Sequence, residues 1–159
     1  MKKILLGIFL SLILISELLA VPNFVQKISL EDDTDELRGI NFKPDGTIMY
    51  VTRRITPAAN SDAGRRGFIN QYSLSTAFDI STATLISTTQ LTEPGETDAT
   101  FSFLPHAIEF KPDGTRMFVG GKDDPSTTGK IKQFTLTNPW DLSSGVSDAG
   151  LSDDLGGAE

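Results

Sequence analysis

Cysteine is absent from the 159-residue chain, and histidine occurs once, as His106. Without cysteine the protein has no disulfide and no lipid-modified N-terminal cysteine, so its stability has to come from packing. The motifs G-x-S-x-G and H-E-x-x-H and the phosphate-binding loop are also missing. A lone histidine is too few for an imidazole metal set. We therefore expect no catalytic residue and no metal-ligand set in this chain.

Positive charge is scarce as well, with 14 Lys and Arg against 21 Asp and Glu and a net charge of −7. Without residues 1–20, twelve basic and twenty acidic residues remain, a net charge of −8. Such an acidic chain repels phosphate backbones, which argues against nucleic acid as a partner. A sustained 3.6-residue apolar period is missing after residue 20, and this favours an all-β chain.

The N-terminus has the three-part pattern of a secretory signal peptide. Two lysines precede an apolar run over residues 4–15, and a short stretch then closes on Ala20. The alternative, a permanent membrane anchor, needs about 20 apolar residues, more than this stretch supplies. We expect residues 1–20 to be cleaved and residues 21–159 to be exported to the periplasm, the cell surface or the medium, with no membrane span.

Two blocks of sequence occur twice. Residues 37–51 read LRGINFKPDGTIMYV and residues 105–119 read PHAIEFKPDGTRMFV, identical at nine of fifteen positions. Residues 67–81 and 129–143 are identical at six of fifteen positions, and most other differences are like-for-like. The offset is 68 residues for the first pair and 62 for the second. This self-similarity predicts two copies of one structural unit.

Each repeat, about 37–91 and about 105–151, has the chemistry of four short strands. Apolar and polar residues alternate before a Pro-Asp-Gly turn at 44–46 and 112–114, and an extended run follows, which indicates a tight hairpin. Alternation in the second block indicates a third strand, and residues 83–88 fit a fourth. Four-stranded units in tandem are typical of β-propeller blades.

The expected fold is therefore all-β, an incomplete β-propeller over 21–159 with partial strands beside the two repeats. Residues 24–30 fit the fourth strand of a preceding blade, and residues 146–159 fit a fourth strand that leads into a third copy. A propeller closes with about 4–8 blades, so two blades leave apolar faces unpaired. Further blades would come from missing sequence or from other chains. We favour missing sequence, because the last residues have no capping chemistry.

The hairpin motif F-K-P-D-G-T-x-M-[YF]-V resembles the F-x-P-D-G-x-x-x-Y-V-x-N signature of the YVTN-type β-propellers and their lactonase-like relatives. Residues 50–52 match it, Arg53 stands where that family usually has Asn, and the second copy departs at Gly120 and Gly121. The resemblance spans about 24–151 and implies a WD40-like propeller. Families with this hairpin include surface-layer proteins, lactonase-like hydrolases and haem-carrying propellers, so the resemblance implies no single activity.

Such a propeller would place the start of each innermost strand, and the loops at 52–66 and 120–128, at one mouth of the central channel. Ligand-binding residues are expected there. The candidates are Arg38, His106, Arg53, Arg54, Lys122 and Asp123. The arginines could clamp an anion, but we favour a solvated loop because no ring of arginines recurs in the second copy. His106 is interpreted as a hydrogen-bonded residue at a strand start, since Arg38 replaces it in the other copy.

Acidic residues precede each innermost strand and could hold Ca²⁺ in an exported protein. They are Glu31, Asp32, Asp33, Asp35, Glu36, Glu93, Glu96, Asp98, Asp153 and Asp154. Their spacing differs in all three places and matches no EF-hand loop. We interpret them as solvated loops and expect no cofactor.

The function expected from the sequence is that of an exported, non-catalytic scaffold for binding or surface interaction, whose partner is an unidentified ligand or protein. One alternative is a fragment of a lactonase-like hydrolase whose other blades supply the remaining carboxylates or histidines. Another alternative is a structural protein of a cell-envelope layer.

Overall fold

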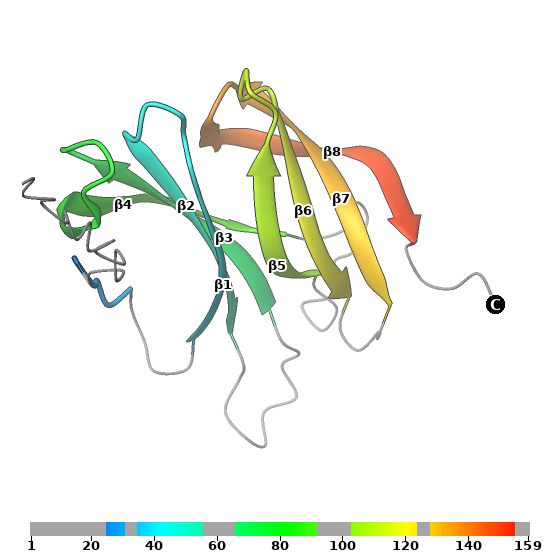
Figure 1. The fold of residues 1–159 in the computed structure, drawn as a ribbon. Helices are drawn as coiled ribbons and strands as arrows, with labels where there is room; N and C mark the ends of the chain where they lie inside the picture. The colour runs from blue at the N-terminus through cyan, green and yellow to red at the C-terminus, as the bar shows by residue number, and fades with distance from the viewer. Residues whose placement is uncertain (1–24, 31–34, 56–65, 92–102, 124–127, 155–159) are drawn as a thin grey trace, which may run out of the picture.

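The described part of the chain forms two four-stranded antiparallel sheets (Figure 1). The computed structural model describes residues 25–30, 35–55, 66–91, 103–123 and 128–154. The first sheet contains, in order, β1 (Asp35–Phe42), β2 (Ile48–Ile55), β3 (Arg66–Leu74) and β4 (Ala83–Gln90). The second contains β5 (Phe103–Phe110), β6 (Arg116–Asp123), β7 (Gly129–Asn138) and β8 (Asp141–Asp154). A 3-10 turn, η1 (Ile80–Thr82), precedes β4. The predicted all-β fold is confirmed.

The predicted Pro-Asp-Gly turns join β1 to β2 and β5 to β6. Gly46 and Gly114 both have a φ of 72°, the left-handed conformation that favours glycine. Asp45 accepts hydrogen bonds from the backbone N–H of Thr47 at 3.0 Å and from its hydroxyl at 2.6 Å, and Asp113 makes the same pair of bonds. The recurring aspartates are therefore turn formers.

Acid should weaken both turns. The Lys43 ammonium, 2.7 Å away, and the Thr47 hydrogen bonds lower the pKa of Asp45 from 3.8 to about 2. Lys111 lowers the pKa of Asp113 in the same way. Because both folded-state pKa values lie below the unfolded ones, this contribution to stability is complete above about pH 4 and is lost as the pH falls toward 2.

We expect the thermal midpoint of the wild type to fall over this interval, modestly because the carboxylates are exposed. The double variant Asp45→Asn, Asp113→Asn should show a smaller fall when unfolding is followed by circular dichroism. An equal fall in both proteins would contradict the assignment.

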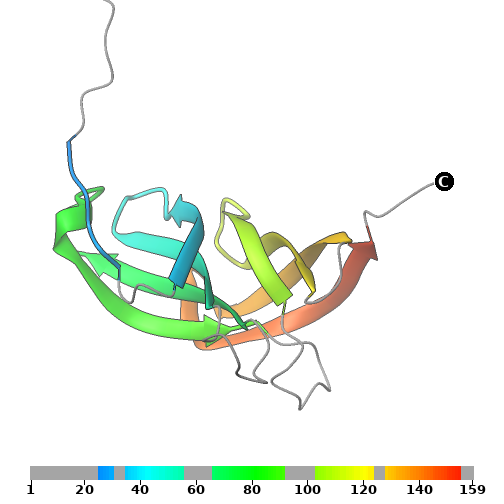
Figure 2. The same cartoon turned by 90° about the horizontal axis from the view of Figure 1, so that it is seen from below.

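The two sheets pack face to face around one apolar core, which we call the inter-sheet core. The first sheet contributes Tyr50, Ile69 and Leu91. The second sheet contributes Phe103, Ile108, Phe110, Met117, Val119, Phe134, Leu136 and Leu142. β5 packs along β1, β2 and β3. Figure 2 shows β1 and β5 together on one side of the molecule and β4 and β8 on the other, so the sheets stand as two successive layers.

Polar contacts fix the two sheets relative to each other. The buried Gln71 donates from Nε2 to the carbonyl of Trp140 at 3.3 Å and accepts from the N–H of Leu142 at 2.8 Å. The hydroxyl of Tyr50 donates to the same Trp140 carbonyl, and burial raises the pKa of Tyr50, so this donor stays protonated. The ring of Tyr50 also lies 4.3 Å from that of Phe110, measured between centroids.

The opposite face of the first sheet carries a second apolar cluster, which we call the outer cluster. Its buried members are Met49, Val51, Tyr72 and Leu74. Leu30 packs against it, but residues 25–30 form no strand, so the fourth strand predicted at 24–30 is not found in its described part. Residues 83–88, by contrast, lie in β4 as predicted.

Residues 1–20, and most of the long loops expected between the strands, lie outside the described residues. Within the described segments, no helix is long or apolar enough to cross a bilayer.

Candidate functional site

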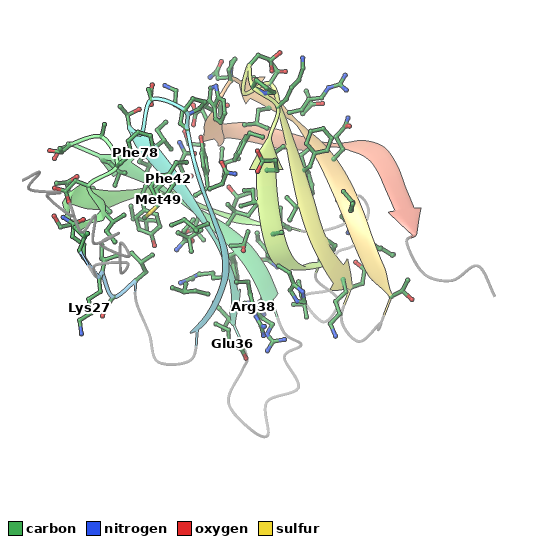
Figure 3. All side chains as sticks on the ribbon, in the orientation of Figure 1. Lys27, Glu36, Arg38, Phe42, Met49 and Phe78 are labelled. Carbon is green, nitrogen blue, oxygen red and sulfur yellow. The ribbon has the colours of Figure 1, made fainter. Side chains whose placement is uncertain are left out.

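Arg38 and His106 occupy equivalent β-bulges near the start of β1 and β5, the first strand of each sheet. The pairing of β1 with β2 skips Arg38, and the pairing of β5 with β6 skips His106. A bulge leaves one residue outside the ladder and re-aims its side chain. The two bulges are in contact, because a Cβ added at Gly39 would lie 2.8 Å from the carbonyl oxygen of His106. Figure 3 shows Arg38 and Glu36 together at the lower end of β1.

Arg54 and Lys122 extend the group from the second strand of each sheet. Arg54 lies opposite Gly67 of β3, and Lys122 lies opposite Gly129 of β7, so both hold the same position in their repeats. We call the set the cationic cluster, and its members are Arg38, Arg54, His106 and Lys122. Each repeat therefore supplies a basic side chain at the bulge and another on the adjacent strand.

The cationic cluster has an excess of positive charge. Burial lowers the pKa of His106, and the positive charges of the other three members lower it further, so its imidazole is neutral at pH 7. Glu36 accepts hydrogen bonds from Arg54, at 2.5 Å, and from Arg38, and these bonds lower its pKa. Among the described residues, Glu36 thus pairs with two of the three permanent cations, Arg38 and Arg54.

The structure places the other two sequence candidates, Arg53 and Asp123, outside the cationic cluster. Arg53 neighbours Arg54 along β2, so its side chain points to the opposite face of the sheet. There its guanidinium lies 5.4 Å from the ring centroid of Phe68. Asp123 forms an ion pair with Lys130 of β7. Of the six candidates, four are brought together.

Within the described residues, no group of three or more histidine, aspartate or glutamate side chains could hold a metal ion. The acidic candidates at 31–34 and 93–98 lie outside those residues. The chemistry that the cationic cluster supports is recognition of an anion, since guanidinium groups offer paired N–H donors to a carboxylate, sulfate or phosphate.

Sequence reasoning missed the equivalence of Arg54 and Lys122. The signal was present, because the 68-residue offset continues past Val51 and Val119 and aligns these two positions. Both residues were assigned to variable loops, whereas they belong to β2 and β6. The bulges have no comparable signal, since a bulge depends on the register between two strands.

Comparison of the chain with protein-family models, with curated proteins and with solved structures finds no significant match. The geometry of the cationic cluster therefore carries the functional interpretation.

Proposed function

We propose that this chain is an exported, non-catalytic binding scaffold of the β-propeller type that holds an anionic group in its cationic cluster. The observation that carries the proposal is the pair of bulges at Arg38 and His106, because the two bulges are in contact and the charge of Arg38 acts on the His106 ring. The propeller-type arrangement is supported by the two equivalent sheets that pack face to face, with β1 and β5 side by side (Figure 2). Export is supported by the pattern in residues 1–20.

The electrostatics favour an anion over a neutral ligand. An anion would offset the repulsion among the three permanent cations, and a desolvated guanidinium pairs well with a planar oxyanion. The Nε of Arg54 is buried and has no hydrogen-bond partner among the described residues, so a ligand oxygen would satisfy it. Anion binding would also favour the protonated form of His106, which then becomes a further donor.

The test is an NMR titration of the His106 ring, whose signals are unambiguous because the chain has one histidine. Citrate, inorganic sulfate and inorganic phosphate are added separately at low ionic strength, with sodium chloride of equal ionic strength as the control. We expect at least one of the three to raise the pKa of His106, and the most effective anion distinguishes carboxylate from sulfate or phosphate recognition. No shift beyond the chloride control with any of them would show the proposal to be wrong.

Arg38→Ala is expected to raise the pKa of His106 in the free protein toward its ordinary value of 6.5, because a nearby positive charge is removed. It should also weaken anion binding about tenfold or more, since a charged hydrogen bond is lost. Arg116→Ala is the matched control, because Arg116 lies at the opposite end of β6 from Lys122. A similar pKa change in both variants would contradict the assigned contacts.

A further inference from the structure

Each sheet has two faces, and the repeat makes the faces of one sheet equivalent to those of the other. In the inter-sheet core, the second sheet presents what we call its receiving face. The members of that face are Ile108, Phe110, Met117, Val119, Phe134 and Leu136. At the same repeat positions the first sheet has Ile40, Phe42, Met49, Val51, Tyr72 and Leu74. The first sheet therefore has a receiving face too, and it is built around the outer cluster (Phe42 and Met49 in Figure 3).

The same equivalence holds for the face that docks onto a receiving face, which we call the inserting face. The first sheet inserts Tyr50, Ile69 and Gln71 into the inter-sheet core. At these repeat positions the second sheet has Phe118, Ile131 and Gln133. Within the described structure, this inserting face packs against no third sheet.

The exposures show what each uncovered face lacks. Ile108 is 6% exposed in the inter-sheet core, whereas its counterpart Ile40 is 56% exposed. Ile69 is fully buried, whereas its counterpart Ile131 is 44% exposed. A cavity of about 390 Å³ opens on the receiving face of the first sheet, and Ile40 and Met49 are among the residues that line it. Met49, Val51, Tyr72 and Leu74 are already buried within one chain, so the cover missing from the receiving face of the first sheet is that over Ile40, and the cover missing from the inserting face of the second sheet is that over Ile131.

Two glycines give the most specific sign of a missing neighbour. A Cβ at Gly67 would lie 2.0 Å from the carbonyl oxygen of Phe103, so the inter-sheet contact requires glycine there. Gly129 holds the same position in the second repeat, yet a Cβ at Gly129 would meet only the carbonyl oxygen of Gly121, at 3.9 Å. Its φ is outside the left-handed range. Nothing in the described structure of one chain requires glycine at 129, but a second contact of the same kind would.

We propose that the receiving face of the first sheet binds the inserting face of the second sheet of another copy of this chain. The contact repeats the one between the two sheets of a single chain, so it is head-to-tail and leaves a free face at each end for further copies. Gln133 of the second copy would bond to the backbone of Phe78 and Ile80, as Gln71 bonds to Trp140 and Leu142. The inference rests on the propeller-type part of the proposed function and does not require a bound anion, although Arg38 of the cationic cluster also lines the cavity on the receiving face.

The N-terminal segment leaves room for this partner. Leu30 packs against the outer cluster, as Leu91 packs into the inter-sheet core. Leu30 therefore covers part of the outer cluster, where a side chain of the second copy would otherwise pack. Residues 25–30 leave the cavity open, and the second copy would supply the remaining side chains.

The experiment is sedimentation velocity and light scattering of the exported protein over a wide concentration range. We expect the wild type to form species larger than one chain as the concentration rises. Gly129→Ala should weaken this association about tenfold to a hundredfold, because the added methyl group overpacks the closed contact. Its own folding should be unchanged, since the added methyl group would make only an ordinary van der Waals contact with the carbonyl oxygen of Gly121.

Gly120→Ala is the matched control, because it adds the same methyl group to the same face at a position where the covered interface accommodates Thr52. It should associate like the wild type. The proposal is overturned if the wild type stays monomeric at all concentrations, if Gly129→Ala associates like the wild type, or if native mass spectrometry finds a monomer with a bound amphiphile in place of an assembly. If the anion-dependent shift of the His106 pKa is unchanged in Gly129→Ala, anion binding does not depend on self-association, and the two proposals are tested separately.

Discussion

Gly67→Ala is expected to lower the free energy of unfolding by about 2–3 kcal/mol, at the upper end of the usual overpacking effect. The new Cβ would lie 2.0 Å from the carbonyl oxygen of Phe103 and 2.3 Å from Cδ of Pro105. The clash is with backbone and a proline ring, which cannot rotate away as a flexible side chain can. β3 and β5 would have to separate, and this would open the inter-sheet core. Urea unfolding followed by the fluorescence of Trp140 measures the change.

Gly120→Ala is the control for the same chemical change in a strand. A Cβ at Gly120 would meet only the Cβ of Ala107, at 3.9 Å, an ordinary van der Waals contact. Its effect should stay within about 0.5 kcal/mol. Equal losses in the two variants would mean that the sheets are not packed as closely as the structure shows.

Ile108→Ala is expected to lower the free energy of unfolding by about 2–4 kcal/mol, because it removes buried methylene and methyl groups and leaves a cavity in the inter-sheet core. The matched variant is Ile40→Ala, at the same position of the first repeat. Ile40 is 56% exposed, so its loss should cost less than about 1 kcal/mol. The pair is compared by urea unfolding at a concentration at which the protein is monomeric.

The two isoleucines have the same repeat position and the same chemistry. The difference between their losses in free energy of unfolding therefore measures the effect of the sheet that packs over Ile108. A large loss at both positions in the monomer would show that the first sheet's receiving face is already covered within one chain. A small loss at both would contradict the inter-sheet core.

The strands and turns were predictable because they depend on local chemistry. The Pro-Asp-Gly turn needs a glycine with positive φ and an aspartate acceptor, and both are visible in the sequence at 44–46 and 112–114. The alternation of apolar and polar residues around each turn then requires extended chains. It was also predictable that the two sheets pack against each other, because the apolar face of one repeat has to be buried against the next repeat.

The details of the site depend on long-range geometry. Arg38 and His106 converge because two bulges shift the register of β1 and β5. No residue type in the sequence predicts such a shift. Arg53 and Arg54 look alike in sequence, yet the alternation along β2 sends them to opposite faces. The strand predicted at 24–30 is absent from the described part of that segment. A strand needs a second strand with which to form backbone hydrogen bonds, and no described strand pairs with residues 25–30.

The convergence of the two bulges is the central claim, and a spin label tests it most directly because the chain has no cysteine of its own. A nitroxide attached at Arg38→Cys would broaden the NMR signals of nearby nuclei, and reduction of the nitroxide would restore them. The structure predicts that the His106 ring signals disappear in the labelled protein and return on reduction. His106 signals that stay sharp beside the active label would contradict the convergence and, with it, the cationic cluster.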